Sequence, residues 1–358
     1  MEIYSLCNKF KQSINTIMND NTTERKKILF VYTGLSSFVK NDLDILASAH
    51  SVETYHFKPV KGILRNTLEI IRQFVYLLIW GWKFDYLYCW FADYHSFLPV
   101  IFAKLSGKKA FVVIGGYDVC RIRKLNYGAF CSPFRGWFCA ASMRKAYLIL
   151  PVSGYVARKA KVIAPLAQQK MIYNCVTPES HETTIYPKTN TVLTVGLIEN
   201  ERTFYLKGID TFIETARLLP DFRFEIVGIN PPKLAHKLEN LPANVTLFDK
   251  ALPEELASFY RKAKIYCQLS RSESFGVSIA EAMSFGVYPI VTNEGGMPEV
   301  VGTVGVVVTR DPQLIAGLIT ERLLKEGLPD ETSIRRRVKD LFSKRQRAES
   351  ILQVIDTV

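Results

Sequence analysis

The most informative stretch of the sequence is Ser270–Val301, SRSESFGVSIAEAMSFGVYPIVTNEGGMPEVV. It predicts the end of a strand, a loop, a helix that begins near Gly276, a second strand and a glycine-rich turn at Gly295 and Gly296. A strand, a helix and a further strand in succession are typical of parallel sheets with crossover helices. The stretch therefore predicts an α/β domain that binds its ligand at the carboxyl ends of the strands.

The same alternation of strands and helices runs through both halves of the chain. Strands are predicted at Lys27–Tyr32, Val52–Phe57, Asp85–Trp90, Ala110–Ile114, Tyr147–Val152, Thr191–Val195, Arg223–Val227, Asn244–Phe248, Ile265–Leu269, Val287–Val291 and Gly305–Val308. Helical segments between them include Phe38–His50, Ile63–Trp80, Ser96–Ser106, Ile209–Leu219, Glu254–Lys262 and Val277–Phe285. Two doubly wound units are therefore expected, joined near the polar stretch Thr177–Asn190, with the ligand between them.

The composition is that of a globular protein with room for two cores. The chain has 358 residues, of which 48% are hydrophobic, 22% charged and 12% aromatic. Its longest apolar run, Phe74–Trp82, is far shorter than the roughly 20 residues of a spanning helix. The N-terminal residues contain no continuous apolar stretch typical of a secretory signal, so a cytoplasmic protein is expected.

The net charge of +12 is unevenly distributed. Residues 1–180 contain 24 Lys and Arg against 11 Asp and Glu, a net of +13, whereas residues 181–358 contain 22 against 23, a net of −1. The first half is therefore expected to face an anionic partner, which could be a membrane surface, a phosphorylated substrate or a nucleic acid. Since no recognised nucleic-acid-binding motif accompanies this charge, we expect no nucleic-acid partner.

The cysteines and histidines indicate neither a disulfide framework nor a metal site. The seven cysteines contain no CxxC pair, and the five histidines have neither HxH nor HExxH spacing. We therefore expect no metal and no cofactor.

Two carboxylates in the Ser270–Val301 stretch are candidate binding residues. Glu273 lies in the predicted loop, and Glu281 follows eight positions later on the predicted helix. Both can face one pocket at the helix N-terminus, where the backbone amides suit a diphosphate. A carboxylate accepts hydrogen bonds from the hydroxyls of a ribose or a sugar, so the combination predicts a nucleotide-sugar pocket. Taken singly, either glutamate could instead be an exposed helical residue or a helix-dipole partner.

The segment ESFGVSIAE, with AMSFGVYPIVTNEGGMPEVV after it, resembles the donor site of the retaining family 4 glycosyltransferases. These enzymes have the GT-B fold, in which two Rossmann-like domains face a central cleft. The resemblance extends over most of the chain, strongly from Thr191 to Gly305 and more weakly from Lys27 to Val176. It implies that Glu273 contacts the donor sugar and Glu281 the nucleotide ribose. The donor-site amides would be those near Ser274, Phe275 and Gly276.

The resemblance also implies a division of labour between the two halves. Residues 1–180 are expected to form a Rossmann-like acceptor domain, and residues 181–340 a Rossmann-like donor domain. A C-terminal helix in residues 341–358 is expected to pack back on the first domain.

A second matching element is Thr194–Ala216, TVGLIENERTFYLKGIDTFIETA. A lysine at the start of a helix can neutralise a diphosphate leaving group without a metal, and the resemblance implies this role for Lys207. The family usually has an arginine directly after the glycine of this strand, but here Leu197 follows Gly196, a further donor-site residue. Our hypothesis is that Arg202 supplies the second positive charge; the alternative is a solvated loop arginine.

The first half offers further candidates for the same site. Gly34 follows the first strand, where glycine would let the chain approach a phosphate or sugar. The segment FVVIGGYDV resembles the family's His-Gly-x-Asp pattern, with glycine in place of the histidine that touches the donor sugar in relatives. His95 could take over that catalytic role or could be structural. The expected acceptor or cleft residues are Gly115, Gly116, Tyr117 and Asp118.

The segment from Val119 to Lys145 is basic and aromatic and contains no acidic residue. Its basic residues are Arg121, Arg123, Lys124, Arg135, Arg144 and Lys145. Basic residues with exposed aromatics suit an anionic membrane surface or a lipid-linked phosphate, but the aromatics could instead fill the core. The amphipathic stretch Ile63–Trp82 could add a membrane-facing helix by the same reasoning.

We therefore expect a metal-independent, retaining glycosyltransferase of the hexosyltransferase type. It would move a sugar from a UDP or GDP sugar to a glycan or lipid-linked acceptor in bacterial-type polysaccharide or glycolipid biosynthesis. It would be cytoplasmic, or peripheral on the inner face of the cell membrane. The alternatives are a noncatalytic membrane-docking protein of the same fold and another nucleotide-sugar enzyme such as an epimerase. The DxD-like Asp42-Leu43-Asp44 is discounted as a metal motif, because neighbouring positions on a helix point apart.

Overall fold

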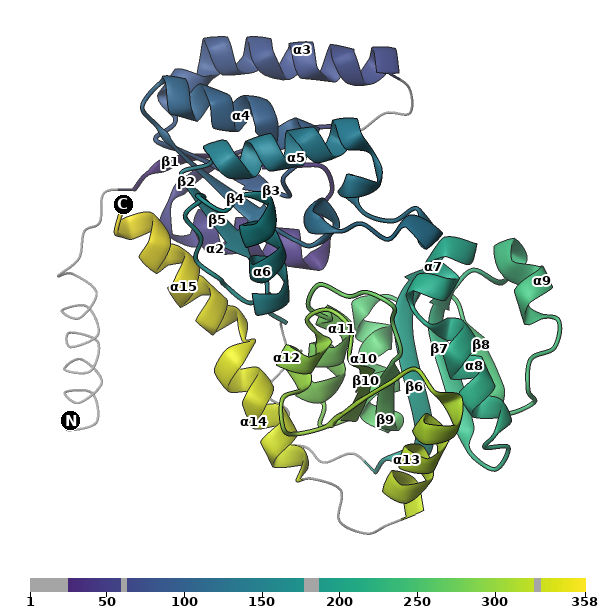
Figure 1. The fold of residues 1–358 in the computed structure, drawn as a ribbon. Helices are drawn as coiled ribbons and strands as arrows, with labels where there is room; N and C mark the ends of the chain where they lie inside the picture. Colours follow the sequence, from purple (N-terminus) through teal and green to yellow (C-terminus); the bar gives the residue numbers. More distant parts are fainter. Residues whose placement is uncertain (1–24, 59–62, 177–186, 325–329) are drawn as a thin grey trace, which may run out of the picture.

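The computed structural model describes residues 25–58, 63–176, 187–324 and 330–358. These residues form two parallel sheets, each with helices on both faces (Figure 1). The prediction of two doubly wound α/β units is confirmed.

The first sheet has the strand order β2-β1-β3-β4-β5, and all its pairings are parallel. Its strands are β1 (Lys27–Tyr32), β2 (Ser51–His56), β3 (Tyr86–Trp90), β4 (Lys109–Ile114) and β5 (Leu148–Pro151). Every residue of β3 is buried, as expected for a parallel strand that is covered on both faces.

The helices of this domain are α2 (Ser37–Ala49), α3 (Ile63–Trp80), α4 (Tyr94–Leu105), α5 (Pro133–Lys145) and α6 (Gly154–Ile163). Figure 1 shows α3, α4 and α5 on one face of the sheet and α2 on the other. Helix α3 is the outermost of its layer, because it packs on α4, which in turn packs on α5.

Helix α4 begins two residues before the predicted start at Ser96. Asp93 precedes the helix, and its carboxylate accepts a hydrogen bond from the Tyr94 amide at 2.9 Å. The Ser96 hydroxyl in turn accepts one from the Asp93 amide at 2.8 Å. This capping box satisfies amides that the helix itself leaves unpaired, so the helix begins at Tyr94, directly after Asp93, and not at Ser96.

The second sheet has the order β11-β10-β9-β6-β7-β8 and is also parallel. Its strands are β6 (Thr189–Ile198), β7 (Arg223–Ile229), β8 (Val245–Phe248), β9 (Ala263–Gln268), β10 (Tyr288–Thr292) and β11 (Val306–Val308). Its helices are α7 (Glu201–Leu206), α8 (Ile209–Arg217), α9 (Ala235–Leu238), α10 (Pro253–Lys262), α11 (Val277–Ser284), α12 (Met297–Val301) and α13 (Pro312–Leu324).

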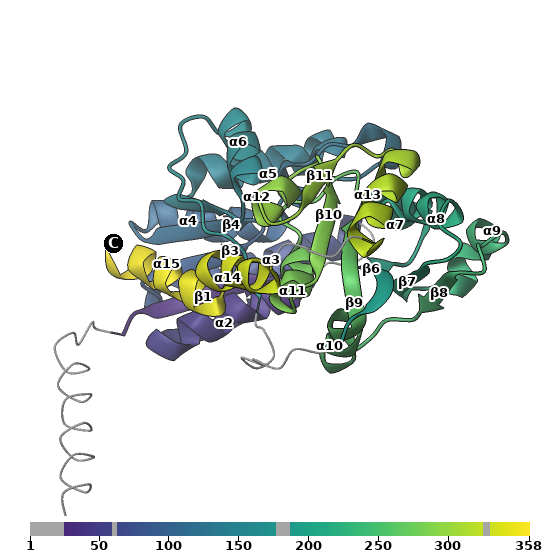
Figure 2. The same ribbon diagram turned by 90° about the horizontal axis from the view of Figure 1, so that it is seen from below.

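Two C-terminal helices, α14 (Glu331–Leu341) and α15 (Lys344–Asp356), connect the domains. Helix α14 packs on α11 of the second domain, and α15 packs on α2 of the first (Figures 1 and 2). The buried guanidinium of Arg347 donates to both carboxylate oxygens of Asp42, at 2.5 and 2.7 Å. Asp42 also accepts from Tyr88 and Trp90, each at 2.8 Å. A residue of α15 therefore completes a polar network inside the first domain.

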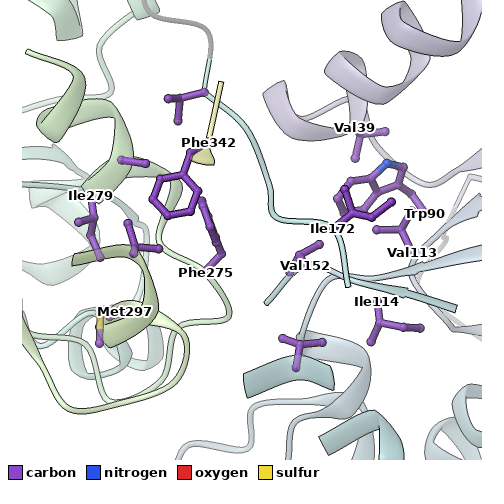
Figure 3. Close-up of a cluster of buried hydrophobic side chains, with 14 of the residues drawn as sticks. Val39, Trp90, Val113, Ile114, Val152, Ile172, Phe275, Ile279, Met297 and Phe342 are labelled. Atoms are coloured by element: carbon purple, nitrogen blue, oxygen red, sulfur yellow. The ribbon is translucent and has the colours of Figure 1, made fainter. Parts of the chain in front are cut away.

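Buried apolar side chains continue from one domain into the other. Figure 3 shows two groups of these side chains. One group contains Phe275 and Phe342, and the other contains Trp90, Val113 and Ile114 of the first domain. The ring of Phe275 lies 5.2 Å from that of Phe342 and packs edge-on against it. The two sheets are thus held together by packing as well as by the C-terminal helices.

No helix among the described residues is long and apolar enough to cross a membrane.

Candidate active site

The site is built around the loop between β9 and α11. β9 ends at Gln268, and α11 begins at Val277, so Glu273 lies on the connecting loop at the carboxyl edge of the sheet. Gly276 precedes the helix with a φ of 98°. A Cβ atom there would lie 2.5 Å from a side-chain carbon of Ile279, so this turn into the helix requires glycine. A helix leaves its first amides without a partner within the helix itself, and here the Ile279 amide donates back to the Gly276 carbonyl oxygen at 3.1 Å.

Lys207 forms an ion pair with Glu273, with 2.6 Å between Nζ and Oε2. Lys207 ends α7 and is followed by Gly208, whose φ is 70°. A Cβ atom at Gly208 would lie 1.9 Å from the carbonyl oxygen of Leu269, just after β9. Glycine therefore lets the backbone before α8 approach the end of β9, and this approach brings the lysine to the glutamate.

A second ion pair, which sequence reasoning missed, braces the same two segments. Both terminal nitrogens of Arg271 donate to the carboxylate of Asp210, at 2.8 and 2.6 Å. The Arg271 side chain also donates to the carbonyl oxygen of Tyr205 at 2.5 Å. A planar guanidinium suits such bidentate pairing, so the positions of Lys207 and Glu273 are held by their neighbours.

Glu281 lies on α11 and is partly buried. The Tyr260 hydroxyl donates to its carboxylate at 3.1 Å. Burial raises the pKa of Glu281 to about 7, and the hydrogen bond from Tyr260 opposes this rise. The carboxylate retains acceptor capacity for other hydroxyl groups.

The glycine-rich turn at Gly295 and Gly296 lies directly behind the Glu273 loop. The Gly296 amide donates to the Glu273 carbonyl oxygen at 2.9 Å. A Cβ atom at Gly295 would lie 1.8 Å from that same oxygen, and the φ of Gly295 is 69°. The two glycines therefore fix the backbone of the loop that carries Glu273.

Of the other predicted donor-site residues, Gly196 lies against Lys207, whereas Arg202 and the side chain of Phe275 are directed elsewhere. A Cβ atom at Gly196 would lie 3.7 Å from the aliphatic carbons of Lys207, an ordinary contact. Arg202, on α7, extends toward the first domain, where Nη1 lies 3.5 Å from the Asn126 carbonyl oxygen. The side chain of Phe275 points into the core, so only its backbone faces the loop.

The first domain contacts the loop between β9 and α11, which carries Glu273, through Gly116 and Ser153. Gly116 has a φ of 113°, and a Cβ atom there would lie 1.7 Å from the Ser274 hydroxyl oxygen. The Ser153 hydroxyl donates to the Ser274 carbonyl oxygen at 2.6 Å. Predicted residues from both halves, Gly116 and Ser274, are therefore in direct contact.

Glu299, within the quoted GGMPEVV segment, was not among the predicted site residues. Its carboxylate accepts hydrogen bonds from the amides of Gly154 and Tyr155, at 2.7 and 2.6 Å. These amides open α6 of the first domain. A carboxylate from the second domain thus caps a helix of the first, where the helix dipole favours negative charge.

The assignment of Asp118 to the acceptor or cleft surface is wrong. Asp118 is fully buried, and its carboxylate accepts from the amides of Ala92, Gly115 and Gly116, at 3.0, 3.2 and 2.7 Å. Burial raises the pKa of Asp118 to about 6, and these amides oppose the rise. Asp118 therefore shapes the glycine loop from beneath.

The catalytic role considered for His95 is also wrong. His95 is buried on α4, with Nε2 2.6 Å from the carbonyl oxygen of Trp90, and burial lowers its pKa. The strand end that was expected to aim this side chain at the ligand instead begins a capped helix, which directs the ring into the core.

Phe91, which sequence reasoning missed, occupies the space above Gly115. A Cβ atom at Gly115 would lie 2.1 Å from the Phe91 ring. Phe91 has a φ of 69°, which is unfavourable for a bulky residue and typical of functional sites. The ring thus fills the position in which a side chain at residue 115 would extend.

The described contacts of Gly34 and Tyr117 include neither Lys207 nor Glu273. Gly34 is exposed in the loop after β1, and nothing lies within 4 Å of a Cβ atom built there. Tyr117 is partly buried, and its hydroxyl accepts from Arg135 at 3.0 Å. The structure therefore gives neither residue a direct link to Lys207 or Glu273.

The basic segment is divided between structural and exposed residues. Arg135 forms an ion pair with Asp93, and Arg144 donates to the Ile163 carbonyl oxygen at 3.0 Å. Neighbours therefore hold both guanidinium groups, although Arg144 itself remains exposed, and the assignment of these residues to a membrane or anionic surface stays a prediction. The exposed basic residues of the segment are Arg121, Arg123, Lys124, Arg144 and Lys145.

Within the described residues, no group of three or more His, Cys, Asp or Glu side chains is arranged to hold a metal ion. Asp44 pairs with Lys40 and Lys344, at 3.1 and 3.3 Å, and these lysines lower its pKa against the effect of its burial.

Comparison with solved structures identifies the two-domain architecture as the GT-B fold. Sucrose-phosphate synthase from Thermosynechococcus elongatus superposes with a TM-score of 0.75 at 15% identity, over 93% of this chain and 99% of that one. The Anabaena protein HepE, solved in complex with UDP and glucose, gives a TM-score of 0.70 at 15% identity, over 93% and 100%.

Comparison of the sequence with protein families and curated proteins gives matches to glycosyltransferases. Residues 177–339 match the family described as Glycosyl transferases group 1. An uncharacterized glycosyltransferase of Methanocaldococcus jannaschii is 34% identical over 100 residues, 26% of this chain and 28% of that protein. The D-inositol 3-phosphate glycosyltransferase of Segniliparus rotundus is 32% identical over 124 residues, 31% and 26% of the two chains. The curated relatives are each matched over less than half of their own length, between 25% and 43%.

Proposed function

We propose that this protein is a retaining glycosyltransferase that transfers a sugar from a nucleotide diphosphate sugar to a hydroxyl group of a glycan or lipid-linked acceptor. The observation that carries the proposal is the 2.6 Å pair of Lys207 and Glu273, placed beside the N-terminus of α11. A cation, a carboxylate and a helix N-terminus at one point suit a ligand with a diphosphate next to a sugar.

The diphosphate leaving group would be bound by Lys207 and the first amides of α11. An ammonium group has three N–H donors, so Lys207 can keep its bond to Glu273 while donating to a phosphate oxygen. Charge that develops on the leaving oxygen would thereby be stabilised in the transition state. This arrangement would require no divalent metal. Arg202 would add a second cation by turning from Asn126 toward the diphosphate.

The sugar would lie against Glu273 and the ribose against Glu281. In the transfer step, the bond from the anomeric carbon to the diphosphate oxygen breaks, and a bond to the acceptor oxygen forms on the same face. The acceptor's proton passes to the departing phosphate. Retention of configuration follows because attack and departure share one face of the sugar.

Two further parts of the proposal concern the donor nucleotide and the biosynthetic role. A UDP sugar is the first donor to test, because HepE, of the same fold, was solved with UDP. A role in polysaccharide or glycolipid biosynthesis, on the cytoplasmic face of a membrane, would supply the acceptor.

The donor site is tested by thermal stabilisation with UDP, GDP, ADP and their sugar conjugates, with and without EDTA. We expect one nucleotide series to raise the Tm equally in both conditions, since a ligand stabilises the state that binds it. Glu281→Ala should lose this shift, whereas Glu294→Ala, which removes an exposed partner of Arg310, should keep it. If no nucleotide stabilised the wild type, a noncatalytic protein of the same fold would replace this proposal.

The reaction is tested by NMR of the slow hydrolysis of the stabilising donor without acceptor. The first anomer released should have the configuration of the donor, and Glu273→Gln should slow release by about 10²-fold or more. Release of the opposite anomer would contradict retention, and wild-type turnover of Glu273→Gln would exclude its assigned role.

A further inference from the structure

Helix α3 presents an apolar face to the outside of the first domain. A surface helix normally directs its apolar stripe inward and its polar residues outward. Here the large side chains on the outward face are about half exposed or more, from 45% for Val75 to 65% for Leu68. We call this set the α3 apolar face, and its members are Leu68, Ile71, Phe74, Val75, Leu78, Ile79, Trp80 and Trp82, the last just beyond the helix.

The orientation of α3 is set by a polar residue that points inward. Gln73 is 1% exposed, and its Nε2 donates to the carbonyl oxygen of His95 on α4 at 2.8 Å. Leu77, one turn further along, is also buried. Rotating the helix to bury the apolar face would break this bond and expose Leu77, so packing within the first domain keeps the apolar face outward.

A basic surface adjoins the C-terminal end of the α3 apolar face. The Lys108 ammonium donates to the Trp82 carbonyl oxygen at 3.1 Å, and the Trp82 ring packs edge-on against Phe102 at 5.3 Å. Lys108 also lines a cavity of about 450 Å³ whose described lining has no acidic residue. The basic residues of that lining are Lys104, Lys108, Lys109, Arg144 and Lys145.

Two of these lysines are available to an external anion. Lys109 and Arg144 are occupied by the carbonyl oxygens of Val358 and Ile163. Lys104 and Lys145 are exposed and have no hydrogen bond or ion pair with any described residue. Leu105, beside Lys104, is 83% exposed, so apolar and cationic groups alternate at this edge.

We propose that the α3 apolar face lies in the interfacial layer of an anionic lipid bilayer, with Lys104 and Lys145 binding lipid phosphates. Apolar side chains with tryptophans at one end, beside lysines with free ammonium groups, match the layering of acyl chains and headgroups. The helix lies on the membrane and does not span it. A second copy of the chain would cover the apolar face but would leave the free ammonium groups of Lys104 and Lys145 without an anionic partner, which a bilayer supplies.

The sequence centred the expected membrane surface on the basic segment 119–145 and gave Ile63–Trp82 as an addition, whereas the structure makes α3 the main apolar surface and leaves Lys145 of the basic segment at its cationic edge. Membrane binding through α3 is also independent of the proposed function, because binding to vesicles requires neither donor nor acceptor. A failure of vesicle binding would therefore remove the membrane setting of the proposed function but not the transfer reaction, and a failure of nucleotide binding would leave the membrane proposal standing.

The test is co-sedimentation of the full chain with vesicles of phosphatidylcholine alone or mixed equally with phosphatidylglycerol. We expect binding to the anionic vesicles that weakens with salt. Ile71→Glu/Leu78→Glu should bind at least tenfold more weakly. The matched control Leu252→Glu/Leu314→Glu makes the same charge change at exposed leucines of the second domain and should bind like wild type.

The charged contribution is tested by Lys104→Glu/Lys145→Glu, which should weaken binding to anionic vesicles more than Lys233→Glu/Lys250→Glu in the second domain. An unchanged Tm for each variant shows that it is folded. The proposal is overturned if the wild-type protein binds neither kind of vesicle. It is equally overturned if Ile71→Glu/Leu78→Glu binds anionic vesicles as strongly as the wild type. It is also overturned if light scattering finds a wild-type dimer that this variant dissociates, because the face would then join two copies.

Discussion

At the scale of single residues, the burial of Glu281 makes the stability of the folded protein depend on pH. Its carboxyl has a pKa of about 7 in the folded protein, against an ordinary value of 4.5, because burial penalises the charged form. Between these two values the folded chain retains a proton that the unfolded chain has lost. Stability due to this group therefore falls as pH rises from about 4.5 to about 7, and the whole cost is present above that range.

We predict that Glu281→Gln removes this pH-dependent cost. Its Tm relative to wild type should rise between about pH 5 and about pH 8, because glutamine accepts the Tyr260 hydrogen bond without a charge. Thermal unfolding across this range measures the difference. A constant difference in Tm would show that Glu281 is not neutral in the folded protein, and Glu254→Gln, at an exposed position, serves as the control.

The residue scale also gives a steric reason for glycine at position 115, where the sequence resemblance leads us to expect a histidine. The Phe91 ring fills the space that a side chain at residue 115 would need. The φ of 69° at Phe91 follows from tertiary packing against Trp90 and Phe38 and is not signalled by the sequence.

At the scale of elements, α6 is capped from the other domain. Its first amides donate to Glu299, while Ser153 caps the next amide from within the chain at 3.2 Å. Such a cap ties the position of α12 to that of α6, and so contributes to holding the loop that carries Glu273 against the first domain.

We predict that Glu299→Ala exposes the start of α6 to solvent. Hydrogen exchange in a peptide that contains Gly154 and Tyr155 should accelerate about tenfold, corresponding to loss of roughly 1–2 kcal/mol of capping. Mass spectrometry measures the rate. Glu294→Ala should leave this peptide unchanged, and an equally slow peptide in Glu299→Ala would mean that the cap does not hold the domains together.

At the scale of the whole molecule, the last helix determines how the first domain is completed. Arg347 and Asp42 are separated by 305 positions, and both are buried. Removing one partner of a buried pair leaves a charge without compensation, which is more costly than removing both.

We predict that Arg347→Leu lowers the free energy of unfolding by about 3–5 kcal/mol. Asp42→Asn in the same chain should restore part of this loss, because the neutral amide still accepts from Tyr88. Denaturant unfolding measures both changes. Arg345→Leu, at a position 84% exposed, is the control, and an equal effect there would assign the loss to the helix as a whole.

The alternation of short apolar strands and amphipathic helices was sufficient to predict both sheets, because periods of two and 3.6 residues depend on local backbone geometry. The loop with Glu273 and the helix with Glu281 were predictable for the same reason, since their spacing lies within one βαβ unit. The expected link Thr177–Asn190 lies largely outside the described residues.

Contacts between distant segments depended on packing that no local pattern contains. Lys207 meets Glu273 across 66 positions, because Gly208 lets two backbones approach. The inward position of His95 and the contact of Glu299 with the first amides of α6 likewise depend on tertiary packing. The helical period revealed that α3 has an apolar stripe, but only the hydrogen bond from Gln73 to His95 set that stripe outward.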